Sequence, residues 1–388
     1  MTFPATKIGA LVDNGFAAIQ TGPFGTQLKA SDYVERGIPV INVRNIGYGS
    51  LRPEKLEFVS DATAERLGVH VLVADDIVFG RKGAVDRHLV VGAEQAGWMQ
   101  GSDCIRLRFT SDSLNPRYVS YAFLRSYHKE WMLLQCGNKA TMASLNQDVI
   151  RRIELPLPRR EQQDAIVATL STYDDLIDNN RKRIALLEEA ARLLYREWFV
   201  HLRFPGHEHV TVVDGVPGGW QRVELGSVLT LKRGYDLPAT RRAPGPVPVV
   251  SSSGITGYHN QSKASGPGVV TGRYGTLGEV YFVENEYWPL NTALYVSDFK
   301  GHDPFFVFQM LKSLLRGVGT QKAAVPGVDR NVLHTMLVVW PSAALRQAFV
   351  ESVRDNQRQI RVLTAMNDKL AKARDLLLPR LMSGEISV

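Results

Sequence analysis

The chain has 388 residues, carries a formal net charge of +7 and is 44% hydrophobic. This length exceeds what one hydrophobic core normally organises, so at least two domains are expected. No run approaches the ~18 consecutive apolar residues of a membrane span, and the N-terminus lacks the pattern of a secretory signal. The two cysteines, Cys104 and Cys136, argue against a disulfide framework and suit a reducing compartment. We therefore expect a cytoplasmic, multidomain protein whose modest positive charge is compatible with a polyanionic partner.

Short apolar strands separated by Gly-rich turns occur first, and a second set of the same kind follows later in the chain. The motif VFGRKGAVDR at residues 78–87 recurs in similar form as VTGRYGTLGE at residues 270–279. Because the offsets between such matching segments drift slowly, the sequence predicts two copies of one domain with loops of different length. The expected fold class is α+β, with domain 1 (1–158) and domain 2 (201–341) each of mixed α/β structure around a curved, barrel-like sheet. The expected strands are 38–44, 76–83 and 104–109, then 246–254, 268–275 and 292–296.

A long segment follows each domain, residues 159–200 and 342–388, and its apolar residues recur at alternating spacings of four and three. This spacing is the heptad seam of a coiled coil, although each helix packing only on its own domain is the alternative. Domain 2 lies between the two segments, so the second helix is expected to begin near the end of the first, in an antiparallel pair. In a full-overlap register Asn180 would face Asn367. The predicted seam comprises Ile166, Leu170, Ile177, Asn180, Ile184, Leu187 and Leu194, then Phe349, Val353, Ile360, Leu363, Asn367, Leu370 and Leu377.

The repeated motif also predicts a DNA-binding hairpin turn in each domain. Gly83 suits the left-handed position that closes a hairpin turn, which leaves Arg81 and Lys82 at the tip, and Arg273 and Tyr274 take those places in domain 2. Arginine is well shaped to bind guanine in the DNA major groove. For one such tip a solvated turn is the better explanation, but two matched tips on two separate domains favour groove binding. The candidate DNA-binding residues are Gln20, Phe24, Arg44, Arg81, Lys82, Lys139 and Asn146 in domain 1, and Lys232, Arg233, Tyr235, Ser251, Ser252, Arg273, Tyr274, Asn291 and Lys322 in domain 2.

Other catalytic and metal-binding patterns are weak. The tetrapeptide NPRY at 115–118 resembles the Asn-Pro-Pro-Tyr signature of amino-methyltransferases, but a helix N-cap followed by proline explains it more simply. His201, His207 and His209 lie in a short linker without nearby cysteines or helical spacing, which favours a solvated loop over a metal site. No Gly-x-x-x-x-Gly-Lys-Ser/Thr loop is present. We therefore expect no catalytic residue and no metal in this chain.

The order of domain, helix, domain and helix resembles the specificity subunit of type I restriction–modification systems. The motifs that carry this resemblance run through nearly the whole chain. They include IQTGPFGTQLKASDYVERGIPVINVRNI at 19–46, DIVFGRKGAV at 76–85, LPLPRREQQDAI at 155–166, TGRYGTLGEV at 271–280 and LLPRLMSGEI at 377–386. Each motif is weak alone, and together, in order, they are specific.

The resemblance implies a non-catalytic subunit that binds double-stranded DNA. Each domain would bind one half of a bipartite, asymmetric target, while the helices would set the spacer between the halves and dock two methyltransferase subunits. It also implies restriction and translocase subunits in the same complex. S-adenosylmethionine and ATP with Mg would belong to these partners, with no cofactor in this chain and no membrane contact. The alternatives are a self-contained DNA methyltransferase or nuclease, and a coiled-coil adaptor that binds only protein.

Overall fold

The computed structural model describes residues 3–137, 143–273, 278–316 and 329–388. The chain divides into two compact units: unit 1 comprises residues 1–179 and 366–388, and unit 2 comprises residues 180–365. Each unit contains parts of two long helices, α6 (Arg160–Tyr195), which continues into a π-helical turn (Arg196–Val200), and α10 (Ala343–Ser383). The finer four-part division at residues 158, 200 and 341 stays a prediction. In the described part of the chain, no helix is long and apolar enough to cross a membrane.

Unit 1 contains two main sheets. The larger has the strand order β2-β10-β7-β8-β5, and the smaller has the order β3-β6-β4-β9, in which β4 and β9 run parallel. A separate pair, β1 (Ala5–Lys7) with β11 (Glu154–Pro156), joins the start of domain 1 to its end. The strands of the two main sheets are β2 (Ala17–Thr21), β3 (Tyr33–Val34), β4 (Ile38–Ile41), β5 (Tyr48–Gly49), β6 (Glu57–Val59), β7 (Ile77–Gly80), β8 (His88–Val90), β9 (Met99–Gln100) and β10 (Cys104–Phe109).

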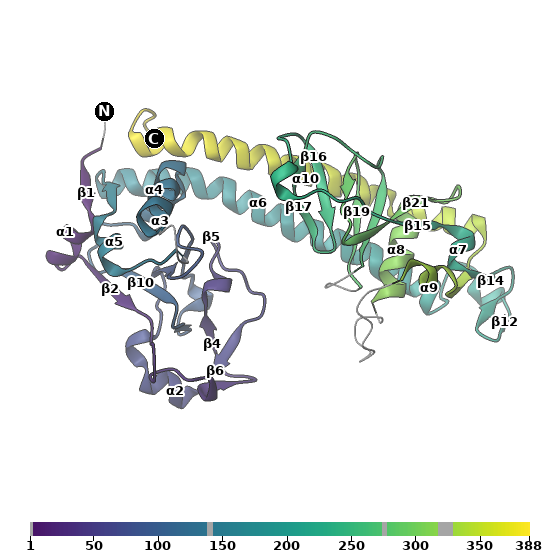
Figure 1. The fold of residues 1–388 in the computed structure, drawn as a ribbon, viewed down its shortest axis with the longest axis horizontal. Helices are drawn as coiled ribbons and strands as arrows, with labels where there is room; N and C mark the ends of the chain where they lie inside the picture. Colours follow the sequence, from purple (N-terminus) through teal and green to yellow (C-terminus); the bar gives the residue numbers. More distant parts are fainter. Residues whose placement is uncertain (1–2, 138–142, 274–277, 317–328) are drawn as a thin grey trace. The chain divides into compact units, whose positions relative to one another are not determined.

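The helices of unit 1 are short apart from the two long ones. Figure 1 shows α3 and α4 lying between the start of α6 and the strands of domain 1. Asn115 caps α3 by accepting hydrogen bonds from the backbone N–H groups of Arg117 and Tyr118, and Pro116 occupies the first helical position. The N-cap interpretation of this motif is therefore confirmed. These helices are α1 (Ile8–Asp13), α2 (Asp61–Arg66), α3 (Pro116–Leu124), α4 (Ser126–Cys136) and α5 (Gln147–Arg152).

Unit 2 repeats the same plan. Its sheets have the orders β15-β21-β18-β19 and β17-β16-β20, and β16 runs parallel to β20 as β4 does to β9. The strand pair β14–β22 again joins the start of the domain to its end. The elements are β12 (Val212–Val213), β13 (Val216–Pro217), β14 (Gln221–Glu224), α7 (Leu225–Val228), β15 (Thr230–Arg233), β16 (Val247–Ser251), β17 (Gly254–His259), β18 (Gly268–Gly272), β19 (Val280–Val283), β20 (Trp288–Pro289), β21 (Ala293–Asp298), α8 (Pro304–Leu315), α9 (Arg330–His334) and β22 (Leu337–Trp340).

The barrel-like sheet expected from the sequence is not found, because each described sheet is open, with two distinct edge strands. The reason lies in the alternation along β7. Ile77 and Phe79 enter the core shared with α3 and the long helices, while Val78 enters a separate core that includes Ile41 on the other face. A sheet covered on both faces by different layers gains its burial without closing on itself. In unit 2, Val269 and Val270 of β18 divide in the same way.

Opposite ends of the long helices pack together within each unit. In unit 1, Ile166 and Leu170 near the start of α6 share a core with Leu381 near the end of α10. In unit 2, Trp198 just beyond α6 meets Phe349 near the start of α10, with ring centroids 6.0 Å apart. Each contact is the one expected from antiparallel helices.

The predicted seam residues are buried or half-buried, including Asn180 and Asn367, whereas off-seam leucines such as Leu186 and Leu376 are 70% and 72% exposed. The facing of Asn180 and Asn367 stays a prediction. Pro379 lies inside α10, close to its C-terminal end.

Candidate nucleic-acid interface

The two Gly-Arg phrases fold in the same way. The amide of Gly80 bonds the carbonyl of Arg87 at 3.4 Å, and that of Gly272 bonds the carbonyl of Glu279 at the same distance. Each following arginine is fixed through its own amide, Arg81 to the carbonyl of Asp103 and Arg273 to the carbonyl of Thr292. The repeated sequence therefore encodes a repeated hairpin base that holds an arginine at the same backbone position in each domain.

The hairpin of domain 1 is braced by a neighbouring segment. Gly83 has a φ of +74°, the left-handed conformation predicted for it. Lys82 Nζ lies 3.2 Å from Asp103 Oδ1, with both side chains about half exposed. The amide of Gly83 bonds the carbonyl of Ala143, and the amide of Leu145 bonds the carbonyl of Arg81. These bonds place Asn146 beside the hairpin, where its side chain accepts a hydrogen bond from the Val149 amide and caps α5.

The other candidates of domain 1 are less closely grouped. Gln20 is half-buried and donates a hydrogen bond to the Thr21 carbonyl, and Thr21 in turn accepts one from Gln147 beside Asn146. Phe24 is 60% exposed. Arg44 pairs with Glu57 at 3.2 Å, on a different strand edge. The structure thus brings Arg81, Lys82 and Asn146 together, with Gln20 nearby through Thr21, and it shows no direct contact of Phe24 or Arg44 with them. Lys139 lies outside the described residues.

In domain 2 the candidates gather around one tyrosine. The hydroxyl oxygens of Tyr235 and Tyr295 lie 3.2 Å apart and share a hydrogen bond. Lys232 Nζ lies 5.5 Å from the Tyr235 ring centre. The hydrogen bond with Tyr295 and the neighbouring Lys232 lower the pKa of Tyr235. The Arg233 Nε donates a hydrogen bond to the carbonyl of Asn291. These four predicted residues, Lys232, Arg233, Tyr235 and Asn291, form one surface that we call the Tyr235 cluster.

The remaining candidates of domain 2 lie on neighbouring turns. Ser251 is only 6% exposed, and its hydroxyl accepts the Ser253 amide and donates to the Gly254 carbonyl, so its side chain serves the turn rather than the surface. Ser252 and Arg273 are half-buried. Tyr274 and Lys322 lie outside the described residues.

Several residues that shape these surfaces were not found from the sequence. Asp103 orients Lys82, and Lys263 lies 5.9 Å from the Tyr235 ring centre and 5.3 Å from that of Trp288. Neither residue belongs to a motif. Asp103 directly precedes the predicted strand 104–109, and a carboxylate in that place could have indicated a partner for the basic hairpin. The sequence around Lys263 gives no comparable indication.

A buried ion pair supports the strands under the domain 1 hairpin. Asp76 is fully buried, and Arg108 of β10 binds it through Nε and Nη2 at 2.6 and 2.7 Å. The hydrogen bonds that Arg108 donates to Asp76 raise the pKa of Arg108. Because one partner without the other would leave a buried charge, this pair fixes the register of β7 against β10.

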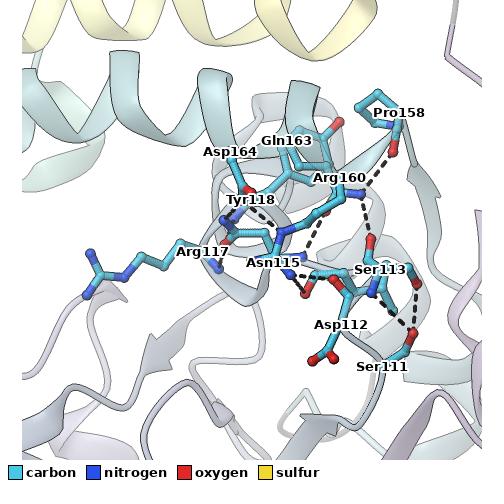
Figure 2. Close-up of polar contacts among 11 residues, drawn as sticks. Ser111, Asp112, Ser113, Asn115, Arg117, Tyr118, Pro158, Arg160, Gln163 and Asp164 are labelled. Carbon is cyan, nitrogen blue, oxygen red and sulfur yellow. Dashed lines mark hydrogen bonds and ion pairs between the residues drawn. The ribbon is translucent and has the colours of Figure 1, made fainter.

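Domain 1 is joined to the start of α6 by polar side chains, shown in Figure 2. Gln163 is 1% exposed; its Oε1 accepts the Asn115 amide at 2.8 Å, and its Nε2 donates to the carbonyls of Ser113 and Pro158. Asn115 Nδ2 donates to Asp164 Oδ1, which also accepts Arg160 Nε. These hydrogen bonds, from Asn115 first and then Arg160, lower the pKa of Asp164. We call Asn115, Arg160, Gln163 and Asp164 junction 1.

Domain 2 meets the start of α10 mainly through rings. Asp303 caps α8 as Asn115 caps α3. The Arg346 guanidinium donates to the carbonyl of Pro341 and lies 4.7 Å from the ring centre of Trp340, which also contacts His302. Phe349 is fully buried. We call His302, Asp303, Trp340, Arg346 and Phe349 junction 2.

The described residues offer little for catalysis or metal binding. The side chain of Asn115 is fully used in capping α3 and binding Asp164, which removes the amino-methyltransferase interpretation of its motif. No group of three His, Cys, Asp or Glu side chains suited to a metal ion occurs within the described ranges. Cys104 is fully buried, and burial raises the pKa of Cys136 to about 11, so both thiols pack as neutral groups.

Comparison with known proteins agrees with this arrangement. Residues 24–189 match the type I restriction modification DNA specificity domain. The chain is 24% identical over 317 residues to the type I restriction enzyme MjaIX specificity subunit of Methanocaldococcus jannaschii, covering 71% of this chain and 70% of that protein. It is 26% identical over 201 residues to the putative MjaX specificity subunit of the same organism, covering 49% of this chain and 46% of the relative.

The fold is similar to the crystal structure of a type I restriction–modification S subunit from M. genitalium, with a TM-score of 0.54 and 14% identity, over 98% of this chain and 96% of that one. The fold defines a protein of two similar mixed α/β units, each of which includes parts of two long helices. The matched domain and the two relatives are thus those of type I restriction specificity subunits, and the solved S subunit shares the fold of this chain.

Proposed function

We propose that the chain is the DNA-reading subunit of a type I restriction–modification complex, and that domain 1 and domain 2 each bind one half of a bipartite target. One observation carries the proposal. The two domains present an arginine on hairpins of the same backbone construction, yet the residue after it is Lys82 in one and Tyr274 in the other. Hairpins with the same backbone and different side chains at their tips suit two different half-sites. The reason is that the side chains that reach the groove discriminate between the base edges.

The surroundings of each tip differ as well. Lys82 is held beside Asp103, whereas domain 2 offers the Tyr235 cluster with Lys232 and Arg233 exposed. Exposed lysines and arginines supply phosphate contacts and most of the salt-dependent affinity, while tip residues supply the choice of bases. Because the two surfaces differ, the target is asymmetric rather than palindromic.

The long helices set the distance between the half-sites in this proposal. Trp198 and Phe349 pair as a full-overlap antiparallel register requires, and Ile166 and Leu381, which that register also pairs, share a core. A stiff antiparallel pair would keep the spacer length fixed. Exposed off-seam residues such as Leu186 and Leu376 are available to dock two methyltransferase subunits.

Catalysis belongs to the partners in this proposal. S-adenosylmethionine would bind to the methyltransferase subunits, and ATP with Mg to the restriction and translocase subunits, while this chain contributes no catalytic residue. The complex would act in the cytoplasm, where its DNA is found.

Methylation mapping tests the proposal. The chain is assembled with its methyltransferase subunits, and the methylated target is read from genomic DNA for the wild type, for Arg81→Ala with Lys82→Ala, and for Arg273→Ala. Each variant is expected to relax one half-site, with discrimination falling by about 1–3 kcal/mol at the affected base, and to leave the other half unchanged. Arg358→Ala, at an exposed position of α10, is the control for lost charge.

Three results would count against the proposal. Changes in both halves from one variant would exclude separate reading by the domains. Methyl transfer by the chain alone would favour a self-contained methyltransferase. A complex without sequence preference would favour a protein-binding adaptor.

A further inference from the structure

A cavity of about 310 Å³ lies in unit 2, lined by α6, α8 and the residues before β19. Four cations line it: Arg192 of α6, Arg196 of the π-helical turn that follows α6, Lys312 of α8, and Arg316, which caps the C-terminus of α8. The carboxylates in its lining are Glu189 and Glu279. Positive charge therefore exceeds negative charge in this lining, and the cavity favours an anion.

Arg192 is only partly satisfied by the protein. Its Nε donates to Glu189 at 2.6 Å, and its Nη2 bonds the same carboxylate. Its Nη1 is buried and has no hydrogen-bond partner among the described residues. A buried guanidinium N–H without an acceptor is costly, and an acceptor from outside the chain removes that cost. The pKa of Glu189 is lowered by Arg192 first and also by Arg316 and Arg196, so the positive field extends across the cavity.

The cavity adjoins the base of the domain 2 hairpin. Gly278 and Glu279 line it, and the Glu279 carbonyl accepts hydrogen bonds from the Gly272 amide and from Thr271 Oγ1. Arg273 directly follows Gly272 on this hairpin. An anion bound in the cavity would therefore lie beside the arginine proposed to enter the groove.

The lining is only partly repeated in unit 1. Lys312 has a basic counterpart in Arg125, but at the offset of the two long helices Arg192 corresponds to Asp375 and Arg196 to Pro379. Near the matching place, Tyr121 donates a hydrogen bond to Asp174, which Arg374 also binds, so these polar groups satisfy one another. The cations at positions 192 and 196 are thus particular to unit 2 and are not part of the repeat.

We infer that this cavity binds one phosphate group of the DNA backbone beside the half-site read by domain 2. The inference rests on the proposed function, because it needs DNA at the domain 2 hairpin. A phosphate supplies the acceptor that Arg192 Nη1 lacks and balances the excess charge of Arg196, Lys312 and Arg316. Such a contact fixes the position of the duplex and raises affinity equally for all sequences.

The first arm of the test uses inorganic phosphate on the full chain, with thermal unfolding as the readout. Phosphate at millimolar concentration is expected to raise the Tm of the wild type, at a fixed ionic strength set with chloride. The rise is expected to disappear in Arg192→Gln and in Arg316→Gln. Arg316 is exposed at the end of α8, so its variant should fold even where Arg192→Gln does not. Arg358→Gln, the same change at an exposed position of α10, should keep the rise.

The second arm measures binding of the complex with its methyltransferase subunits to a duplex containing the mapped target. Arg316→Gln is expected to weaken binding roughly tenfold, with the same preference among sequences, and to lower the slope of log K against log salt by about 1. Replacing single phosphates by neutral methylphosphonates should reveal one position, beside the domain 2 half-site, where the wild type loses affinity and Arg316→Gln does not.

The outcomes separate this inference from the proposed function. A response to inorganic phosphate with unchanged DNA affinity and no methylphosphonate position would mean a free-anion site, and would overturn the DNA assignment. No phosphate response and wild-type DNA binding in the variants would overturn the site altogether while leaving the reading of half-sites intact. A wild-type complex without target preference would refute the proposed function, and with it this inference.

Discussion

Junction 1 and junction 2 attach equivalent domains to equivalent helix starts by different chemistry. In junction 1, Gln163 connects three backbone groups through directional hydrogen bonds. In junction 2, Arg346 takes the equivalent position and also donates to a proline carbonyl, Pro341 in place of Pro158, but its remaining contacts are with the Trp340 ring. The carbonyl at the helix start is satisfied in both cases.

This difference shows which part of the repeat is constrained. The proline carbonyl at each helix start needs a hydrogen-bond donor of fixed geometry, and both junctions provide one. The side chains around them need only fill space or satisfy one another. The two domains were therefore free to diverge at their attachments, as they did at their hairpin tips, while keeping the same backbone plan.

The largest expected effect concerns the aromatic side of the comparison. Phe349 is fully buried, with ring centroids 5.4 Å from Phe199 and 5.7 Å from Tyr195. Phe349→Ala should destabilise unit 2 by about 3–5 kcal/mol, because it leaves a cavity among rings that cannot collapse. Urea unfolding gives the loss, and hydrogen exchange of unit 2 peptides locates it. Leu376→Ala, at a position 72% exposed, should change stability by less than about 0.5 kcal/mol. An equal increase in hydrogen exchange of unit 1 peptides would contradict the prediction that Phe349 stabilises unit 2 alone.

The second expected effect is a difference between the two units in how their stability depends on pH. Burial lowers the pKa of both His88 and His128 of unit 1 to about 3. The unfolded chain binds protons on these residues below pH ~6.5, while the folded chain does not, so stability is present above that pH and is lost as pH falls. Between pH 7.5 and 5.5 these two residues together should lower the stability of unit 1 by about 3 kcal/mol. His302 and His334 of unit 2, whose pKa values burial also lowers, are only half-buried, and we expect a smaller loss there.

Unit-specific hydrogen exchange at several pH values checks this expectation. His128 stacks on Phe123 with a centroid distance of 4.7 Å, so His128→Phe keeps an aromatic ring in place and should remove about half of the pH dependence. An unchanged pH slope in this variant would show that other groups govern acid sensitivity.

The smallest of the three effects concerns the polar side of the comparison. Gln163→Leu should cost about 2 kcal/mol, because the amide of Asn115 and the carbonyls of Ser113 and Pro158 lose their partner inside the protein. Exchange should increase in peptides around residues 113–118 and not in unit 2. Gln359→Leu, the same substitution at an exposed position of α10, is the matched control. A loss no larger than that of the control would mean that junction 1 is held by packing alone.

The sequence by itself determined the repeated domains, the two long helices and the hairpin that holds Arg81 and Arg273. Each depends on local rules, since heptad spacing, an N-cap with proline and a glycine in a turn act through neighbours in the chain. It did not determine the open sheets, because closure depends on what covers each face of β7 and β18, and those layers come from distant segments. Likewise, Lys263 and Arg192 belong to no motif, and the motif that contains Gln163 does not show which backbone groups its side chain binds. Only tertiary packing decides which buried polar atoms find a partner, and that is why the basic cavity of domain 2 could not be predicted from the sequence.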